Sequence, residues 1–110
     1  YLTSHPEFVS VTYHIRNSEN NYVYILTNKY RTVFYIGVTN NLIKRIEAHK
    51  EGIGSAFTQK YNVKSLIYFE DFTSISQDML REKQLKNWKR EWKINLIKSK
   101  NPNLEDISIL

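Results

Sequence analysis

Several side chains that could perform acid–base or phosphate chemistry stand in the middle of the chain. Arg45 and His49 are four residues apart in a segment with helical spacing, so they are expected to lie on one side of a helix. Tyr24 and Tyr35 stand in two β-type runs, and Glu82 stands in a later helical segment. Each residue also has a structural interpretation: half-buried packing for the tyrosines, a solvated helix edge for Arg45 and His49, and a surface ion pair for Glu82. The absence of cysteine excludes disulfides, thiolate metal sites and cysteine nucleophiles, and leaves oxygen donors and histidine as metal ligands.

The size and charge of the chain narrow its class. Its 110 residues fit one domain, and 16 Lys and Arg against 11 Asp and Glu give a net charge of +5. Residues 81–100 hold eight basic and two acidic side chains, a net +6. This charge fits a polyanionic partner and a solvated helix face equally well. No apolar stretch approaches the roughly 18 residues that span a bilayer, so we expect a soluble cytoplasmic protein without a membrane partner.

The strands that must position the tyrosines form a predicted hairpin. Residues 22–27 and 32–38 are rich in Tyr, Val, Ile and Thr and flank a polar loop at residues 28–31. With a loop of that length, Tyr24 is expected opposite Tyr35. One face of the hairpin then carries an apolar set: Val23, Ile25, Phe34, Ile36 and Val38. The other face carries Tyr22, Tyr24, Tyr35 and Gly37.

The rest of the pattern predicts a small α+β domain. A short amphipathic helix is expected over residues 42–50, a loop over 54–58 and a third strand over 64–71. A long helix follows from about Asp78, capped by Ser74 or Ser76, with a break near Arg90 and a stop at Asn101. Its predicted buried stripe is Met79, Leu85, Trp88, Trp92 and Leu96.

We therefore expect a three-stranded antiparallel sheet flanked by helices, in the order β β α β α, with the last helix open to being split in two. This domain covers residues 21–110. Residues 1–20 show little periodicity and are expected to form a partly disordered N-terminal arm.

Six sequence features occur in an order and spacing that resemble the GIY-YIG endonuclease superfamily. The resemblance is strongest to its small single-domain bacterial members, and it extends to the GIY-YIG domain of a nucleotide-excision-repair endonuclease. It covers about four-fifths of the chain and rests on residues 22–26, 34–42, Arg45 to His49, Phe57-Thr58, 81–86 with Trp88, and Asn101-Pro102. Tyr22 and Val23 depart from the Gly and Ile of the named motif. Since glycine there supplies backbone freedom rather than a functional group, we expect a changed local contact and unchanged chemistry.

The resemblance implies a GIY-YIG-type fold and a divalent-metal-dependent endonuclease acting on DNA, with structure-specific repair or recombination among its roles. It implies that Tyr24 is a general base for the attacking water and that Tyr35 helps to position that water. Arg45 then contacts the scissile phosphate and His49 lies near the nucleophile. Glu82 holds the metal ion, Mg²⁺ or Mn²⁺.

Phosphodiester hydrolysis gives these assignments a physical basis. It needs a deprotonated nucleophile and stabilisation of charge on the phosphate and on the leaving oxygen. One carboxylate suffices for Mg²⁺, which keeps several waters and takes further ligands from substrate phosphates. Tyrosine is a poor base at its usual pKa of about 10, so Tyr24 needs nearby cations such as Arg45 or a protonated His49.

The basic residues become candidates for phosphate contacts once the nuclease interpretation is adopted. They are Lys44, Lys83, Lys86, Lys89, Arg90 and Lys93. The two tryptophans are expected in the core rather than in base stacking, and Glu70 and Asn101 are expected to have structural or capping roles. We expect a monomer that binds DNA and needs no protein partner. The alternatives are a noncatalytic nucleic-acid-binding module of the same fold and a protein-interaction adaptor, which would need an exposed apolar patch.

Overall fold

The computed structural model describes residues 20–108, so the predicted arm at residues 1–20 lies almost wholly outside the described residues. Three strands form one antiparallel sheet: β1 (Asn21–Thr27), β2 (Phe34–Thr39) and β3 (Ser65–Phe72). Their order in the sheet is β2-β1-β3, so β1 is central and β2 is an edge strand. Among residues 20–108, no helix has the length and apolar character needed to cross a membrane.

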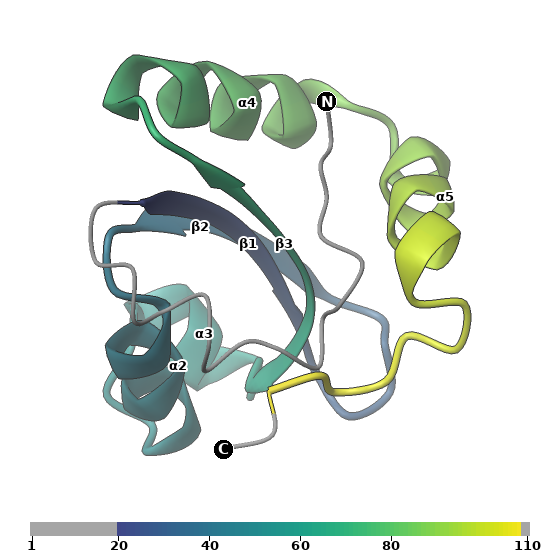
Figure 1. The fold of residues 1–110 in the computed structure, drawn as a ribbon. Helices are drawn as coiled ribbons and strands as arrows, with labels where there is room; N and C mark the ends of the chain where they lie inside the picture. Colours follow the sequence, from purple (N-terminus) through teal and green to yellow (C-terminus); the bar gives the residue numbers. More distant parts are fainter. Residues whose placement is uncertain (1–19, 109–110) are drawn as a thin grey trace.

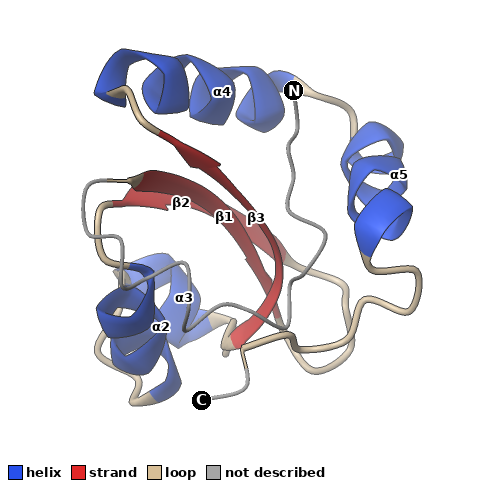
Figure 2. Cartoon of the chain, viewed as in Figure 1, coloured by secondary structure: helices blue, strands red, loops and turns tan. Residues whose placement is uncertain are grey.

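Helices cover both faces of the sheet. α2 (Leu42–Lys50) and α3 (Ala56–Lys60) lie on one face, and α4 (Ile75–Asn87) and α5 (Arg90–Lys100) lie on the other (Figures 1 and 2). The architecture is therefore the predicted α+β layer arrangement, with the last helix split in two and with one additional short helix.

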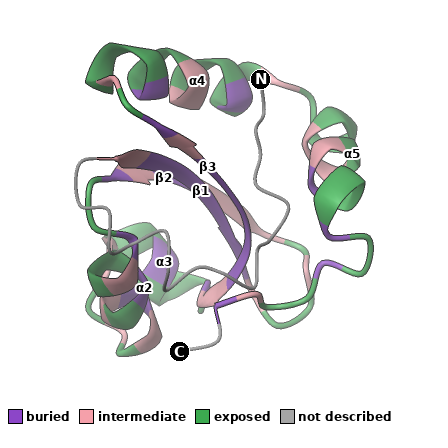
Figure 3. Cartoon of the chain, viewed as in Figure 1, coloured by how far each residue is buried: buried purple, intermediate pink, exposed green. Residues whose placement is uncertain are grey.

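Each face of β1 packs into its own hydrophobic cluster, so the central strand is buried from its second residue to its end (Figure 3). Tyr22, Tyr24 and Leu26 pack with Leu42 and Ile46 of α2. The alternate side chains of β1 pack against the helices of the other face, where Leu85 of α4 and Ile97 of α5 are buried. The predicted division of the hairpin into an apolar face and a tyrosine face is confirmed.

The predicted hairpin register is wrong by two residues. Tyr24 pairs with Gly37, not with Tyr35. A shift of two residues keeps every side chain on its own face, because side chains alternate with period two along a strand. The hydrophobic pattern therefore identifies the faces correctly and leaves the register open to this error.

The cause of the shift is a longer turn over residues 28–33. The Asn28 side-chain oxygen accepts hydrogen bonds from the backbone N–H groups of Thr32 (2.8 Å) and Val33 (3.2 Å). Arg31 takes a positive φ of 58° inside this turn. The Asn28 side chain thus accepts from two backbone N–H groups. With a four-residue loop, these groups would have had to bond within the strand pairing.

The predicted helix over residues 42–50 is confirmed, and Asn41 caps it by accepting from the Lys44 N–H. The predicted loop over residues 54–58 is wrong, because α3 begins at Ala56. Ser55 is its N-cap, and its side chain accepts from the Thr58 N–H. A serine that can accept a hydrogen bond from the backbone N–H three residues later is a signal for the start of a helix. Ser55 is such a serine and indicates α3.

The expected break near Arg90 is confirmed, and the last helical region consists of two helices. Ser74 caps α4, as expected, and the extended backbone of Trp88 (φ −73°, ψ 151°) ends it before α5 starts at Arg90. Because the chain changes direction there, one helical stripe cannot run through both helices. Trp92 and Met79, predicted to be buried, are 49% and 57% exposed.

A buried ion pair fixes α4 against the sheet. Arg81 donates to both carboxylate oxygens of Glu70 on β3, each at 2.9 Å, and the Tyr68 hydroxyl donates to Glu70 at 2.7 Å. Asn101 caps α5 and donates to the Ile67 carbonyl at 3.0 Å. Glu70 and Asn101 therefore have the structural roles predicted for them.

Candidate active site at the edge of the sheet

The phenol of Tyr24 passes over a glycine of the edge strand. Tyr24 lies on β1 opposite Gly37 of β2, and a Cβ at Gly37 would stand 2.6 Å from the Tyr24 hydroxyl oxygen. No side chain other than hydrogen leaves room for the ring at this point. Gly37 therefore allows a tyrosine of the central strand to bring its hydroxyl to the sheet edge.

His49 of α2 faces this hydroxyl, with 3.4 Å between its Nε2 and the Tyr24 oxygen. Its Nδ1 is 3.0 Å from the Thr58 hydroxyl, which donates its own proton to the Ser55 carbonyl at 3.0 Å. With Thr58 donating to Ser55, its hydroxyl can accept from Nδ1–H, and in that tautomer Nε2 is an acceptor for the Tyr24 O–H. A Cβ at Gly54 would collide with the His49 ring, so this imidazole also requires a glycine neighbour.

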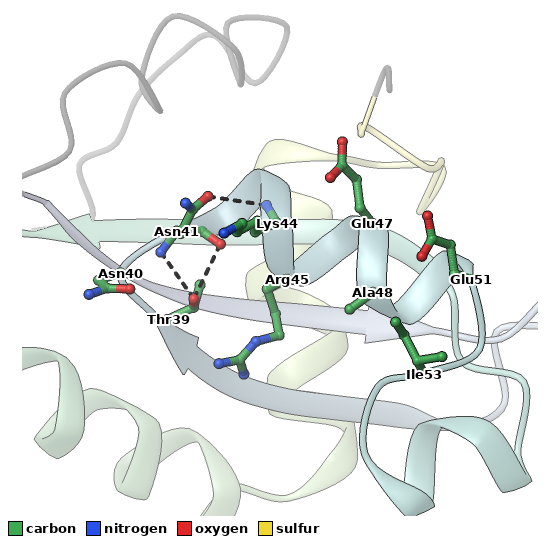
Figure 4. A pocket seen from close by; sticks show the side chains of 9 residues that line it. All are labelled: Thr39, Asn40, Asn41, Lys44, Arg45, Glu47, Ala48, Glu51 and Ile53. Atoms are coloured by element: carbon green, nitrogen blue, oxygen red, sulfur yellow. Dashed lines mark hydrogen bonds between the residues drawn. The ribbon is translucent and has the colours of Figure 1, made fainter.

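Arg45 lies one turn before His49 on α2 and completes the contacts of the phenol. Its Nη1 donates to the Tyr24 hydroxyl at 3.2 Å and lies 3.5 Å from the Val38 carbonyl of the edge strand. Figure 4 shows the guanidinium extending from α2 toward the strands. It lines an open hollow of 440 Å³ with Lys44 and Asn40, so a phosphate can reach it.

The ring of Tyr35 lies against the rings of Tyr24 and His49. Its ring centroid is 6.3 Å from that of Tyr24 and 5.6 Å from that of His49. The ring of Phe57 on α3 stacks on its other side at 6.0 Å. The structure thus brings Tyr24, Tyr35, Arg45 and His49 into one cluster, although they come from three elements.

Burial decides the protonation of this cluster. It raises the pKa of Tyr24 to about 12, outweighing the opposite effect of Arg45. It also lowers the pKa of His49, and the Arg45 charge acts in the same direction. His49 is therefore neutral at pH 7, which contradicts the expectation that a protonated His49 could favour the Tyr24 phenolate.

Glu82 lies on α4, on the other face of the sheet, and its negative charge contributes to the raised pKa of Tyr24. Among the described residues, no hydrogen bond or ion pair joins it to the cluster. It pairs with Lys86 at 2.8 Å and is partly exposed. A cavity of 230 Å³ joins Glu82 to Val38 and Thr39 of the edge strand.

Asp78 lines the same cavity one helical turn before Glu82. It is 3% exposed, and its Oδ1 atom has no hydrogen-bond partner among the described residues. Burial, with a further contribution from Glu82, raises its pKa. Val38, Ile75 and Met79 give the cavity an apolar part, and its polar part consists of carboxylate, amide and hydroxyl groups, whose oxygens suit a hard ion such as Mg²⁺. Within residues 20–108, three or more His, Asp or Glu side chains do not gather into a metal-binding group.

Three of the six basic residues named from the sequence, Lys44, Lys86 and Lys93, line hollows beside the edge strand. Lys86 and Lys93 line a hollow of 320 Å³ beside Tyr35, which also contains Phe57. Burial and the charge of Arg90 lower the pKa of Lys93.

The other basic candidates lie on or beside the same helices. Arg90 packs over the Phe34 ring at 4.8 Å, and Lys89 lies over Trp92 at 5.6 Å. Lys83 is exposed on α4. The charge expected on a single helix is therefore divided between α4, α5 and their connection.

Sequence reasoning missed the residues that orient the cluster. Thr58 and Gly54 hold the His49 ring, and Asp78 was assigned no role. The capping signal at Ser55 could have placed Thr58 on a helix facing α2, whereas nothing in the sequence indicates that Asp78 is buried.

The fold is a small α+β domain with a three-stranded antiparallel sheet, at whose edge Tyr, His and Arg side chains meet. The family model described as GIY-YIG catalytic domain matches residues 20–95. The chain belongs to the GIY-YIG family and, within it, to the small UPF0213 proteins. Members of the GIY-YIG family are generally nucleases.

Two relatives and one solved structure illustrate the match. A UPF0213 protein of Clostridium perfringens is 43% identical over 81 residues, which is 74% of this chain and 86% of the relative. One of Pediococcus pentosaceus is 36% identical over 86 residues, or 78% of this chain and 90% of that protein. The solution NMR structure of a UPF0213 protein from Bacillus halodurans is 31% identical, with a TM-score of 0.52, and covers 83% of this chain and 96% of its own.

Proposed function

We propose that the protein is a divalent-metal-dependent endonuclease that hydrolyses phosphodiester bonds in DNA. Its catalytic residues in this proposal are Tyr24, Tyr35, Arg45, His49 and Glu82. The observation that carries the proposal is the Tyr24 hydroxyl oxygen, held between Arg45 Nη1 at 3.2 Å and His49 Nε2 at 3.4 Å. A buried phenol between a cation and a neutral imidazole can exchange a proton with water at the point where Arg45 receives a phosphate.

The proton path follows from the protonation of the cluster. A phenol with a pKa of about 12 holds its proton at pH 7. Tyr24 can accept a proton from water only as its own moves to His49 Nε2, which is free to receive it. The resulting hydroxide attacks phosphorus, the bond to the leaving oxygen breaks, and Arg45 stabilises the charge on the phosphate oxygens. Tyr35 covers the two proton-transfer groups and helps to hold the water.

Glu82 is the proposed ligand of Mg²⁺ or Mn²⁺. Such an ion, when bound, supplies positive charge for the leaving oxygen. The contribution of the chain is to hold the Glu82 carboxylate at the edge strand, which the Arg81–Glu70 pair achieves by fixing α4 on β3.

The proposed DNA surface consists of six basic residues carried by α2, α4, α5 and the connection between α4 and α5. They contact phosphates and position the backbone, without reading sequence. These residues are Lys44, Lys83, Lys86, Lys89, Arg90 and Lys93. The protein acts as a monomer on DNA in this proposal, with no membrane or obligate protein partner. Repair or recombination and a cytoplasmic location stay predictions.

Cleavage of labelled duplex, flap, fork and single-stranded DNA with Mg²⁺ or Mn²⁺ tests the function. The parent should cut at least one substrate, and Glu82→Ala should not. Glu91→Ala, which removes an exposed carboxylate of α5, is the matched control and should cut as the parent does. A parent that binds DNA with a steep salt dependence but cuts none of these substrates would favour the noncatalytic binding module.

A further inference from the structure

Asp78 is a buried carboxylate that the proposed chemistry does not use. It lies on the inner side of α4 with 3% exposure, and it faces the 230 Å³ cavity that Glu82 also lines. Four residues separate the two acids on the helix, so their side chains are neighbours. The polar groups on the opposite wall of the cavity belong to Asn21, Thr39 and Asn40.

One oxygen of the Asp78 carboxylate lacks the partner that a buried charge needs. Its Oδ1 is inaccessible to solvent and has no hydrogen-bond donor among the described residues, although the carboxyl also accepts a hydrogen bond from the Met79 backbone. Burial and the like charge of Glu82 raise its pKa, which means that neither stabilises its charged form. Buried charges in proteins are generally paired or coordinate metals, because an unpaired one loses its hydration without compensation. A cation in this cavity would compensate both acids together.

We propose that Asp78 is a second carboxylate ligand for the divalent ion that Glu82 holds. This inference rests on the proposed function and extends its metal site by one residue. Mg²⁺ commonly takes one or two protein carboxylates and completes its shell with waters and substrate phosphates. Asp78 and Glu82, on successive turns of one helix, offer such a pair, and the open side of the cavity leaves room for the remaining ligands.

A purely structural role for Asp78 makes different predictions. Asp78 stands in the first turn of α4, where a negative charge interacts favourably with the helix dipole. That effect acts on the stability of the helix and is independent of divalent ions. It also leaves Oδ1 without a partner.

Titration of the DNA-free protein with Mn²⁺, followed by electron paramagnetic resonance, separates the two roles. We expect saturable binding to the parent and binding weaker by about 10–100-fold in Asp78→Asn, the range for losing a group that supports a metal site. Asp78→Ala is the second variant, and both are checked for folding by circular dichroism. Glu91→Gln removes an exposed carboxylate of α5 and should bind Mn²⁺ as the parent does.

The Mn²⁺ affinities and the cleavage results together separate the second ligand from the nuclease function. Equal Mn²⁺ affinity in the parent and in the folded Asp78 variants would overturn the inference, as would a parent that binds no Mn²⁺ at millimolar concentrations. If the parent still cuts DNA in an ion-dependent manner and Glu82→Ala does not, the proposed nuclease function stands while the second ligand falls. If Mn²⁺ binds through Asp78 and DNA is never cut, the metal site stands and the nuclease function falls.

Discussion

The phenol of Tyr24 owes its place to residues from three elements. Gly37 of β2 leaves room for it, while Arg45 and His49 of α2 contact its oxygen from two sides. Thr58 of α3 contacts the other ring nitrogen of His49, with 3.0 Å between its hydroxyl and Nδ1. At this scale the chemistry depends on contacts that a shift of a few tenths of an ångström would change. Small substitutions should therefore have large effects.

Substitution of Gly37 by alanine tests the close approach. The new methyl group would meet the Tyr24 hydroxyl at 2.6 Å, which we expect to destabilise the fold by about 1–3 kcal/mol and to displace the phenol from His49. The measurement is urea unfolding of Gly37→Ala in the parent and in a Tyr24→Ala background, as a double-mutant cycle. The cost should largely disappear when the ring is absent. An equal cost in both backgrounds would refute the steric explanation.

The lowered pKa of His49 predicts the direction of a pH effect. The folded protein keeps His49 neutral below the usual value of 6.5, whereas the unfolded chain protonates it there. The unfolded state then binds more protons, so this stabilisation is present above pH 6.5 and is lost as the pH falls through the lower folded value. Unfolding free energies at several pH values should decrease over this window in the parent and less so in His49→Gln. Parallel pH profiles for the two proteins would contradict a buried neutral imidazole.

At the scale of elements, the sheet and the helices were largely predictable, and the reasons for the exceptions are physical. Alternation along 22–27 and 32–38 identified both faces of the hairpin, but alternation is blind to a shift of two residues, so the turn closed by Asn28 set a different register. Helical spacing identified α4 and α5 without revealing their change of direction at Trp88. Trp92 is therefore exposed although its spacing from Leu85 fits a buried stripe.

The candidate site was predictable as a set of residue types and not as a geometry. The motif spacing brought forward Tyr24, Arg45 and His49, which the structure places in contact. Their protonation depends on how deeply they are buried, which a sequence does not contain. For the same reason the unpartnered oxygen of Asp78 appears only in three dimensions.

The Glu70–Arg81 pair should hold α4, and with it Glu82, in place. The side chains are 3% and 11% exposed, and loss of one partner of a buried pair costs about 3–5 kcal/mol because the other charge remains buried. We expect Glu70→Gln to lower the free energy of unfolding by an amount in this range. The partly exposed Lys50–Asp106 pair is the control, since Lys50→Gln should cost less than about 1 kcal/mol. Similar costs for the two substitutions would mean that Glu70 does not anchor the helix.

At the scale of the whole molecule, part of the positive charge lies beside the sheet edge where the candidate catalytic residues meet. Lys44 lies in the hollow of Arg45, while Lys86 and Lys93 lie in the hollow of Tyr35. A DNA backbone that reached Arg45 would therefore have cations on both sides.

This arrangement predicts the salt dependence of DNA binding. Lys86→Gln with Lys93→Gln should weaken binding to all sequences and reduce the slope of log K against log salt by about one for each lost phosphate contact. Lys98→Gln with Lys100→Gln removes the same charge from the last turn of α5 and should change the slope less. Fluorescence anisotropy at several salt concentrations measures both. Equal slopes for the two double variants would argue against a positioning surface at the sheet edge.

The most direct test of the central claim is the single-turnover rate of DNA cleavage by Tyr24→Phe, measured at saturating protein so that DNA binding does not limit the rate. Removal of one oxygen atom from a phenol held by Arg45 and His49 should lower the rate by about 10²–10⁴-fold, the usual contribution of a general base, while DNA affinity stays unchanged. Cleavage by Tyr24→Phe at the parent rate would contradict the proposed site.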